Sequence, residues 1–207
     1  TNFRINYFKK IDDFYELFFN EYEKSKFKKI DKNKLQNFVD KKKLTYSFYS
    51  FNDLKFRFIR DQMLVQNEYE KLMDKIIQEK GIKIADIGKN LWLTNTHLKN
   101  LSKNGHEIGL HSYDHPTTLS KLSYEEQYEQ YKKNYMHIKQ VCNKDVQCMA
   151  HPSNSYSTDT LKILTEFNII CGFRSNMSSP YRKTNNPNPL EISREDHTNI
   201  LQKLGCN

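Results

Sequence analysis

Two histidines separated by three residues, His111 and His115, lie in the most histidine-rich stretch of the chain, residues 105–116. This stretch reads Gly-His-Glu-Ile-Gly-Leu-His-Ser-Tyr-Asp-His-Pro. Neutral imidazoles are zinc ligands, and a catalytic zinc site adds a third protein ligand, typically a carboxylate, and an open position for water. His111 and His115 therefore fit two ligands of a metal site. On spacing alone, two loop histidines that merely hydrogen-bond to their surroundings are the favoured interpretation.

A short strand followed by a tight loop is the element that would position these histidines. Histidines four apart usually share one face of a helix, but here Gly109 precedes the pair and Pro116, which lacks a backbone N–H, follows it. We therefore expect Ile108 and Leu110 in a buried strand, with both histidines at its carboxyl end. Open α/β sheets and barrels carry their functional groups at this end.

The first ninety residues predict polar amphipathic helices. We expect Asn52 to cap one helix and Asn67, with Glu70 three residues later, to cap the next. Residues 46–51 are rich in aromatic side chains and predict a strand or an extended link. Nothing in this part resembles a catalytic motif, so residues 1–90 are predicted to be a mainly helical subdomain.

From residue 91 onward, short helices alternate with short apolar runs. We predict helices that begin after Thr94, Ser123 and Thr158, strands over 107–110, 146–150 and 169–173, and a polar loop over 178–189. Tyrosines recur at helical spacing behind Ser123 and predict a stripe that packs against the core. Alternating strands and helices are typical of parallel βα units, so residues 91–207 are predicted to be an α/β core.

Composition limits the class of protein. Aromatic residues make up 13% of the 207 residues and compensate for a low hydrophobic content of 37%. The net charge of +8 comes from short lysine runs mixed with acidic residues, which favours a solvated surface over a nucleic-acid or other polyanion site. The four cysteines show no paired C-x-x-C spacing, and no apolar run approaches the roughly 20 residues of a membrane span. We expect reduced thiols, a cytoplasmic location, no nucleic-acid partner and no membrane span.

The histidine segment closely resembles the second motif of the polysaccharide deacetylase family, the NodB-homology carbohydrate esterases. The matching letters are Gly-His-Glu-Ile-Gly followed by His-Ser-x-x-His-Pro. The predicted helices before and after this segment resemble their counterparts in that family, and Ala150-His151-Pro152 resembles the start of its third motif. The resemblance covers residues 91–173. It implies a partial, distorted β/α barrel that carries an N-terminal helical insertion.

The resemblance also implies a chemistry. In that family the histidines at positions 111 and 115 bind one divalent metal, with zinc favoured, and the enzyme removes an N-acetyl group from a sugar or polysaccharide. By position, His151, Asn154 and Tyr156 are candidates for substrate binding, with stabilisation of their loop as an equally good interpretation. His197 is the candidate for the histidine that protonates the departing amine, although the residues around it differ from the family's pattern.

One motif of the family is not found in the sequence. The family's acidic residues come from Thr-Phe-Asp-Asp-Gly, and the closest string here, Ser50-Phe51-Asn52-Asp53-Leu54, has Asn in place of the base and no glycine. Two interpretations follow. In the favoured one, the aspartates precede Thr1 and the chain is part of a longer metal-dependent deacetylase. In the other, the chain is a catalytically inactive, carbohydrate-binding relative.

Overall fold

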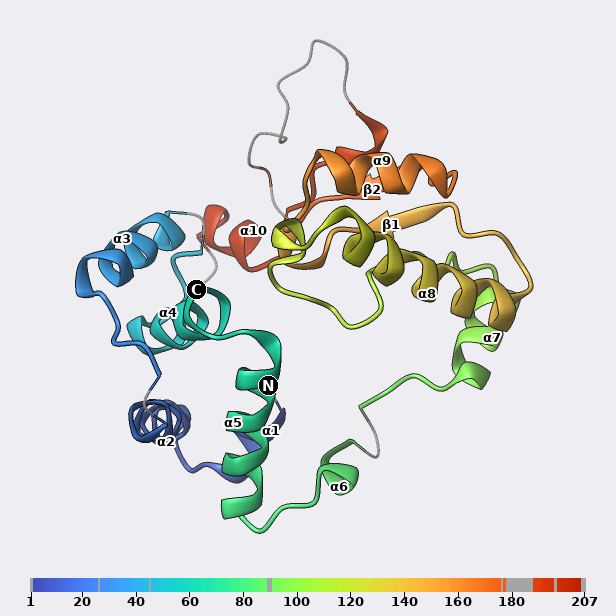
Figure 1. Cartoon of the computed structure of the whole chain (residues 1–207). Coiled ribbons are helices and arrows are strands. Elements are labelled where there is room, and N and C mark those ends of the chain that lie inside the picture. The colour runs from blue at the N-terminus through green and yellow to red at the C-terminus, as the bar shows by residue number, and fades with distance from the viewer. Residues whose placement is uncertain are drawn as a thin grey trace. The chain divides into compact units, whose positions relative to one another are not determined.

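The computed structural model describes residues 2–25, 27–44, 46–88, 91–175, 177, 188–195 and 197–205. It divides the chain into two compact units, Thr1–Trp92 and Leu93–Asn207 (Figure 1). Each unit has hydrophobic cores of its own. None of the described helices is both long and apolar enough to cross a lipid bilayer.

The regular elements of the first unit are all helical in its described residues. Its elements are α1 (Asn2–Tyr7), α2 (Ile11–Lys24), α3 (Lys32–Lys43), α4 (Phe51–Phe58), a π-helical turn η1 (Ile59–Met63), α5 (Gln66–Glu79) and α6 (Ile84–Gly88). Aromatic rings from α2 and α4 form the centre of its core, where Phe18 and Phe56 meet edge to face with centroids 4.7 Å apart. This packing confirms that aromatic residues supply much of the buried surface.

Two predicted helix caps in this unit are wrong. Ser50 caps α4 by accepting a hydrogen bond from the backbone N–H of Asp53 at 3.1 Å, whereas the Asn52 amide donates to Asp12. Helix α5 starts before Asn67, and its N-cap is Val65, whose N–H donates to the Glu68 carboxylate at 3.0 Å. Residues 46–50 form a turn that leads into α4, so no strand lies there.

The second unit combines helices with a small parallel sheet. Its elements are α7 (Asn95–Lys103), η2 (Leu119–Lys121), α8 (Tyr124–Cys142), β1 (Cys148–Ala150), η3 (Pro152–Asn154), α9 (Thr158–Glu166), β2 (Cys171–Phe173), η4 (Pro189–Glu191) and α10 (His197–Lys203). Most of the predicted loop 178–189 lies outside the described residues.

Four extended segments lie side by side in chain order in this unit. Strands β1 and β2 pair in parallel, Leu110 forms a parallel bridge with Met149, and Ile192 forms one with Phe173. The strands are shorter than predicted, because only Leu110 of residues 107–110 pairs with β1. Within the described ranges the fold is therefore mainly helical with a small parallel β-sheet. The parallel order agrees with the prediction, while a wider barrel remains a prediction.

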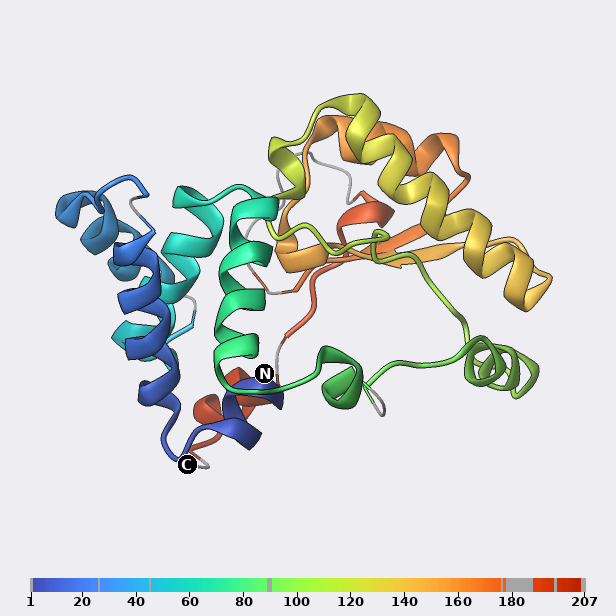
Figure 2. The same cartoon turned by 60° about the horizontal axis from the view of Figure 1, so that its bottom comes forward.

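Helices α8 and α9 lie together on one face of these strands (Figure 2). The predicted tyrosine stripe of α8 packs here, with Tyr131 fully buried and Tyr124, Tyr128 and Tyr135 against the same core. Ser123 forms the predicted capping box with Glu126, since each side chain accepts the other residue's backbone N–H. The cap of α9 is Ser157, one residue before the predicted Thr158.

Candidate metal-binding site

The carboxyl ends of the four parallel segments bring distant parts of the sequence to one edge. His111 follows Leu110, His151 follows β1, Arg174 follows β2, and Ser193 follows Ile192. Backbone hydrogen bonds fix this register, among them Ala150 N–H to Leu110 O and Arg174 N–H to Ile192 O. The histidine segment thus ends at the edge where parallel sheets carry functional groups.

His111 is oriented by the neighbouring strand. Its Nδ1 lies 2.8 Å from the carbonyl oxygen of Ala150. Because a carbonyl can only accept, Nδ1 carries the hydrogen, and the neutral ring then has a free lone pair on Nε2. Metal-binding histidines are commonly oriented in this way by a second hydrogen bond. Desolvation lowers the pKa of His111 below its ordinary value, the hydrogen bond to Ala150 opposes this shift, and the nearby charges of His115 and Arg194 add to it. The net lowering of the pKa favours the neutral ring that a metal ion requires.

The loop that follows brings the second histidine beside the first. The ring centroids of His111 and His115 are 4.8 Å apart, and the planes are inclined by 61°. Ser112 and His115 have positive φ angles of 60° and 54°, which are uncommon for residues other than glycine. The loop therefore adopts a tight conformation in which the rings converge. Both histidines therefore lie close together as predicted, although they follow the single bridge of Leu110 and not a full strand.

Two polar residues of α8 hold this loop in place. Asn134 Oδ1 accepts the backbone N–H of His111 at 2.9 Å. Gln130 Oε1 accepts the N–H groups of Tyr113 and Asp114 at 3.1 and 2.9 Å, and its amide donates to the Asp114 carboxylate. Sequence reasoning missed both residues. Their separation by four positions on α8 was the available signal, because it places them on one helix face beside the tyrosine stripe.

The residues present fit two ligands of a metal site. His111 and His115 supply the imidazole donors that zinc and similar ions take. Between them, the buried Ser112 hydroxyl has no hydrogen-bond partner. Across the described ranges, however, no group of three His, Cys, Asp or Glu side chains is arranged to hold a metal ion. His111 and His115 are therefore candidate ligands, and in the described ranges no third His, Cys, Asp or Glu side chain is grouped with them.

The residues predicted to bind substrate lie beside this edge but make internal contacts. His151 is 1% exposed, and its Nε2 donates to the carbonyl oxygen of Leu190 at 2.8 Å. Tyr156 stacks on the His151 ring and donates to Glu191 Oε1 at 2.7 Å. Asn154 Oδ1 accepts the N–H of Ser175. These contacts stabilise the third motif against the end of the sheet, and a role in substrate binding remains a prediction.

His151 should make the stability of the protein depend on pH. Burial lowers the pKa of His151 to about 4, from an ordinary value of 6.5. Below pH 6.5 the unfolded chain binds a proton that the folded chain rejects, so stability falls as the pH falls toward 4. At about 1.4 kcal/mol per pH unit, the free energy of unfolding should decrease by about 2 kcal/mol between pH 7 and pH 5.

Urea unfolding of the wild type and of a His151→Gln variant would measure this effect. Glutamine can still donate to Leu190 O but does not titrate. The variant should therefore lose about 2 kcal/mol less stability than the wild type between pH 7 and pH 5. The other histidines titrate in both proteins and cancel in the comparison. Equal pH dependence of the two proteins would contradict the prediction.

His197, the predicted proton donor, is the first residue of α10 and is exposed. Glu195, nearby in sequence, accepts hydrogen bonds from Asn199 and Lys203, and Asp196 lies outside the described residues. The assignment of His197 as the catalytic acid remains a prediction.

Comparisons with known proteins agree with the motifs. A curated relative, "Uncharacterized protein YlxY" of Bacillus subtilis (strain 168), is 34% identical over 102 residues, which are 48% of this chain and 32% of the relative. The chain thus spans about a third of that protein's length. Among solved structures, the Streptococcus pyogenes deacetylase PplD in complex with acetate matches with a TM-score of 0.45 and 20% identity over 65% of this chain and 64% of the other.

A second matching structure is BA3943 from Bacillus anthracis, described as a CE4 family pseudoenzyme, with a TM-score of 0.35 and 25% identity over 52% of this chain and 38% of the other. The model of the family described as polysaccharide deacetylase matches residues 51–171, which include the histidine loop and the elements that position it. This match spans more than half of the 207 residues. The chain therefore belongs to the polysaccharide deacetylase family.

Proposed function

We propose that the chain is the metal-binding part of a hydrolase that removes an N-acetyl group from a sugar or polysaccharide. The observation that carries this proposal is the convergence of His111 and His115, with Nδ1 of His111 bound to Ala150 O. This arrangement places two imidazole rings side by side and leaves Nε2 of His111 free to bind a metal ion. Membership of the polysaccharide deacetylase family supports a carbohydrate substrate and an amide bond as the target.

The proposed roles follow from this geometry. His111 and His115 hold one divalent metal, and zinc suits their nitrogen donors. When bound, such a metal supplies Lewis-acid polarisation of the amide carbonyl and a more acidic water. Gln130 and Asn134 keep the loop in the conformation that brings the rings together. Because no third ligand is identified among the described residues, we assign no step of proton transfer within this site.

Release of acetate from chitotetraose, a tetramer of N-acetylglucosamine, tests the proposal. We expect the full chain to release acetate, a chelator to reduce the rate by more than about 100-fold, and added zinc to restore it. Direct acetate detection also separates hydrolysis from binding. A rate that the chelator leaves unchanged would contradict a metal-dependent reaction.

A non-catalytic carbohydrate-binding protein is the second candidate. It is favoured by one observation, namely that the described residues hold two metal ligands and no arrangement of three. This candidate predicts saturable binding of chitotetraose without any release of acetate, with or without zinc. The same assay therefore distinguishes the two functions.

A further inference from the structure

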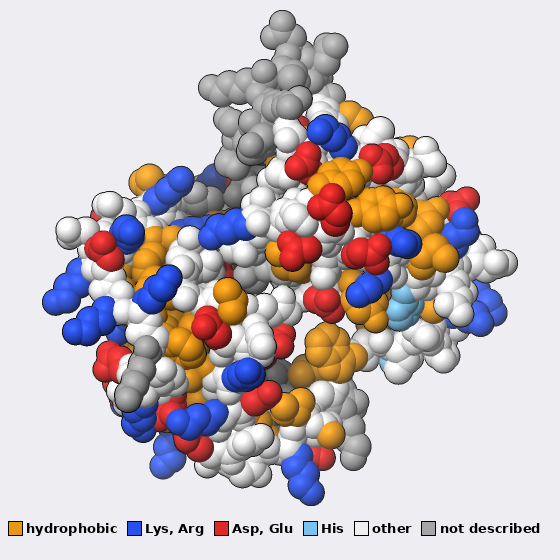
Figure 3. Space-filling model, in the orientation of Figure 1, with side chains coloured by type: hydrophobic (Ala, Val, Ile, Leu, Met, Phe, Trp, Pro, Cys, Tyr) orange, Lys and Arg blue, Asp and Glu red, His pale blue; other side chains and the backbone are white. Residues whose placement is uncertain are grey.

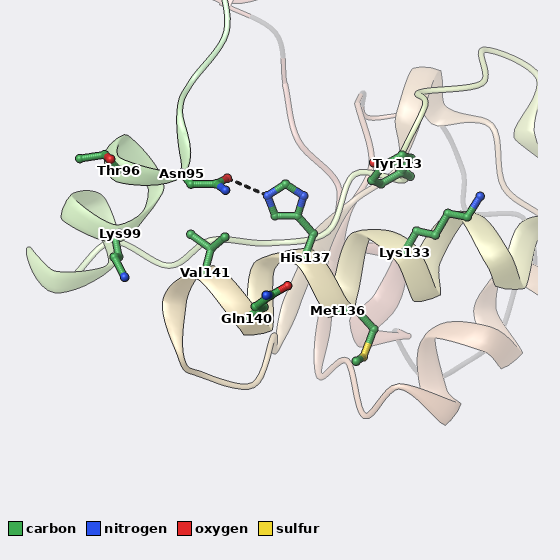
Figure 4. A pocket seen from close by; sticks show the side chains of 9 residues that line it. All are labelled: Asn95, Thr96, Lys99, Tyr113, Lys133, Met136, His137, Gln140 and Val141. Carbon is green, nitrogen blue, oxygen red and sulfur yellow. Dashed lines mark hydrogen bonds between the residues drawn. The ribbon is translucent and has the colours of Figure 1, made fainter.

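A groove lies next to the histidine loop, between α7 and α8 (Figure 4). Its volume is about 720 Å³, which is within the range of ligand sites in proteins. Tyr113, which lies between the two histidines in sequence, lines the groove near Lys133 of α8. A ligand in this groove would therefore extend directly from the histidine loop.

The lining can recognise a sugar. Tyr113 is 52% exposed and Met136 is 58% exposed, so both offer apolar surface to the C–H face of a pyranose, with Lys133 Nζ 5.9 Å from the centre of the Tyr113 ring. Asn95 Oδ1 accepts a hydrogen bond from His137 Nε2 at 2.9 Å, which crosses from α7 to α8. This bond leaves the Asn95 amide N–H groups available as donors, and Gln140 adds a second amide. Exposed amides and an aromatic ring together suit a hydroxylated ring.

The charged side chains that line the groove are positive. Lys99 of α7 and Lys133 of α8 line the groove, and among the described residues no Asp or Glu does. In the part of the chain that the structure describes, neither lysine forms an ion pair, whereas Lys132, Lys139 and Lys162 all do. Elsewhere on the face shown in Figure 3, basic and acidic side chains are interspersed. The groove is therefore a local positive site, and the net charge of +8 is not gathered into one broad patch on that face.

The two lysines lie apart and come from different helices (Figure 4). Each can meet a singly charged group, but they do not converge on one point as a clamp for a doubly charged phosphate would. Sugar units that carry one carboxylate each match this arrangement. We propose that the groove binds a carboxylate-bearing sugar unit, adjacent along a polysaccharide to the N-acetyl sugar at His111 and His115. This inference rests on the proposed function, because it places the acetylated unit at the histidine loop.

Binding of two tetrasaccharides to the metal-free full chain tests the inference. A hyaluronan tetrasaccharide alternates glucuronate with N-acetylglucosamine, while chitotetraose has the same length without carboxylates. By calorimetry at low salt, we expect hyaluronan to bind about tenfold more tightly, and added salt should remove the difference. The double variant Lys99→Gln/Lys133→Gln should bind both ligands with the affinity of chitotetraose.

Lys103→Gln/Lys144→Gln is the matched control, because it removes the same charge from exposed positions of the same unit that do not line the groove. It should keep the preference for hyaluronan. Equal affinity of the wild type for both ligands, or an unchanged preference in the Lys99/Lys133 variant, would overturn the inference. Acetate release from chitotetraose is measured separately. If no acetate is released but the preference for hyaluronan depends on the two lysines, the hydrolase proposal is wrong and the groove proposal stands. If acetate is released but the preference does not depend on the lysines, only the groove proposal is wrong.

Discussion

A His111→Ala variant should lose metal binding while remaining folded. Removing one of the two proposed ligands should lower the affinity for zinc by more than about 100-fold, since loss of even an indirect hydrogen-bond partner costs 10- to 100-fold. Acetate release should fall to background. The fold should survive, because the backbone N–H of His111 still donates to Asn134. Metal content after dialysis, measured by mass spectrometry, gives the direct result.

His106→Ala is the matched control for this prediction. His106 belongs to the same segment and is exposed, but it lies before Leu110, the residue that pairs with β1. Its replacement should leave zinc content and acetate release unchanged. If His111→Ala retains one zinc per chain, or if both variants lose it equally, the histidine pair is not the metal site.

The convergence of these histidines could be predicted because local chemistry determines it. Gly109 and Pro116 exclude a regular helix, so the pair had to lie in a strand end and loop. The residues that hold the loop could not be found in the same way. Gln130 and Asn134 lie 16 to 23 positions away from the backbone N–H groups that they bind, and these hydrogen bonds depend on how α8 packs across the strands. Packing of this kind leaves little trace in one sequence.

Helix caps show the same division at a smaller scale. Ser123 was identified because the Ser-x-x-Glu pattern satisfies two backbone N–H groups at once. Asn52 was misassigned because its side chain has a tertiary partner, Asp12, which lies 40 positions away. The burial of His151 was likewise invisible to sequence reasoning, since its ring lies against Leu190 and Tyr156. A polar side chain thus has several competing partners, and only the fold selects among them.

Gly109→Ala should destabilise the second unit and weaken the metal site together. A Cβ atom at this position would lie 2.7 Å from Cys148 Sγ and 2.9 Å from the Cys148 carbonyl oxygen, closer than real Cβ atoms approach. The same carbonyl accepts the N–H of Leu110 at 2.9 Å, so the added methyl group pushes the segment around Leu110 away from β1. Overpacking of this kind costs about 1–3 kcal/mol.

The displacement should also change the orientation of the His111 ring, because its Nδ1 is hydrogen-bonded to the carbonyl oxygen of Ala150 in β1. Zinc affinity should therefore fall in Gly109→Ala although both ligands remain. Chemical unfolding and zinc titration measure the two effects, and Gly88→Ala provides the control, because its Cβ would meet no atom closer than 3.4 Å and alanine favours a helix. Adding Cys148→Ala removes the sulfur contact but keeps the carbonyl contact, so it should restore stability only in part. If Gly109→Ala keeps the stability and the zinc affinity of the wild type, the prediction is wrong. The segment around Leu110 would then tolerate separation from β1, and its pairing with β1 would not be what positions His111.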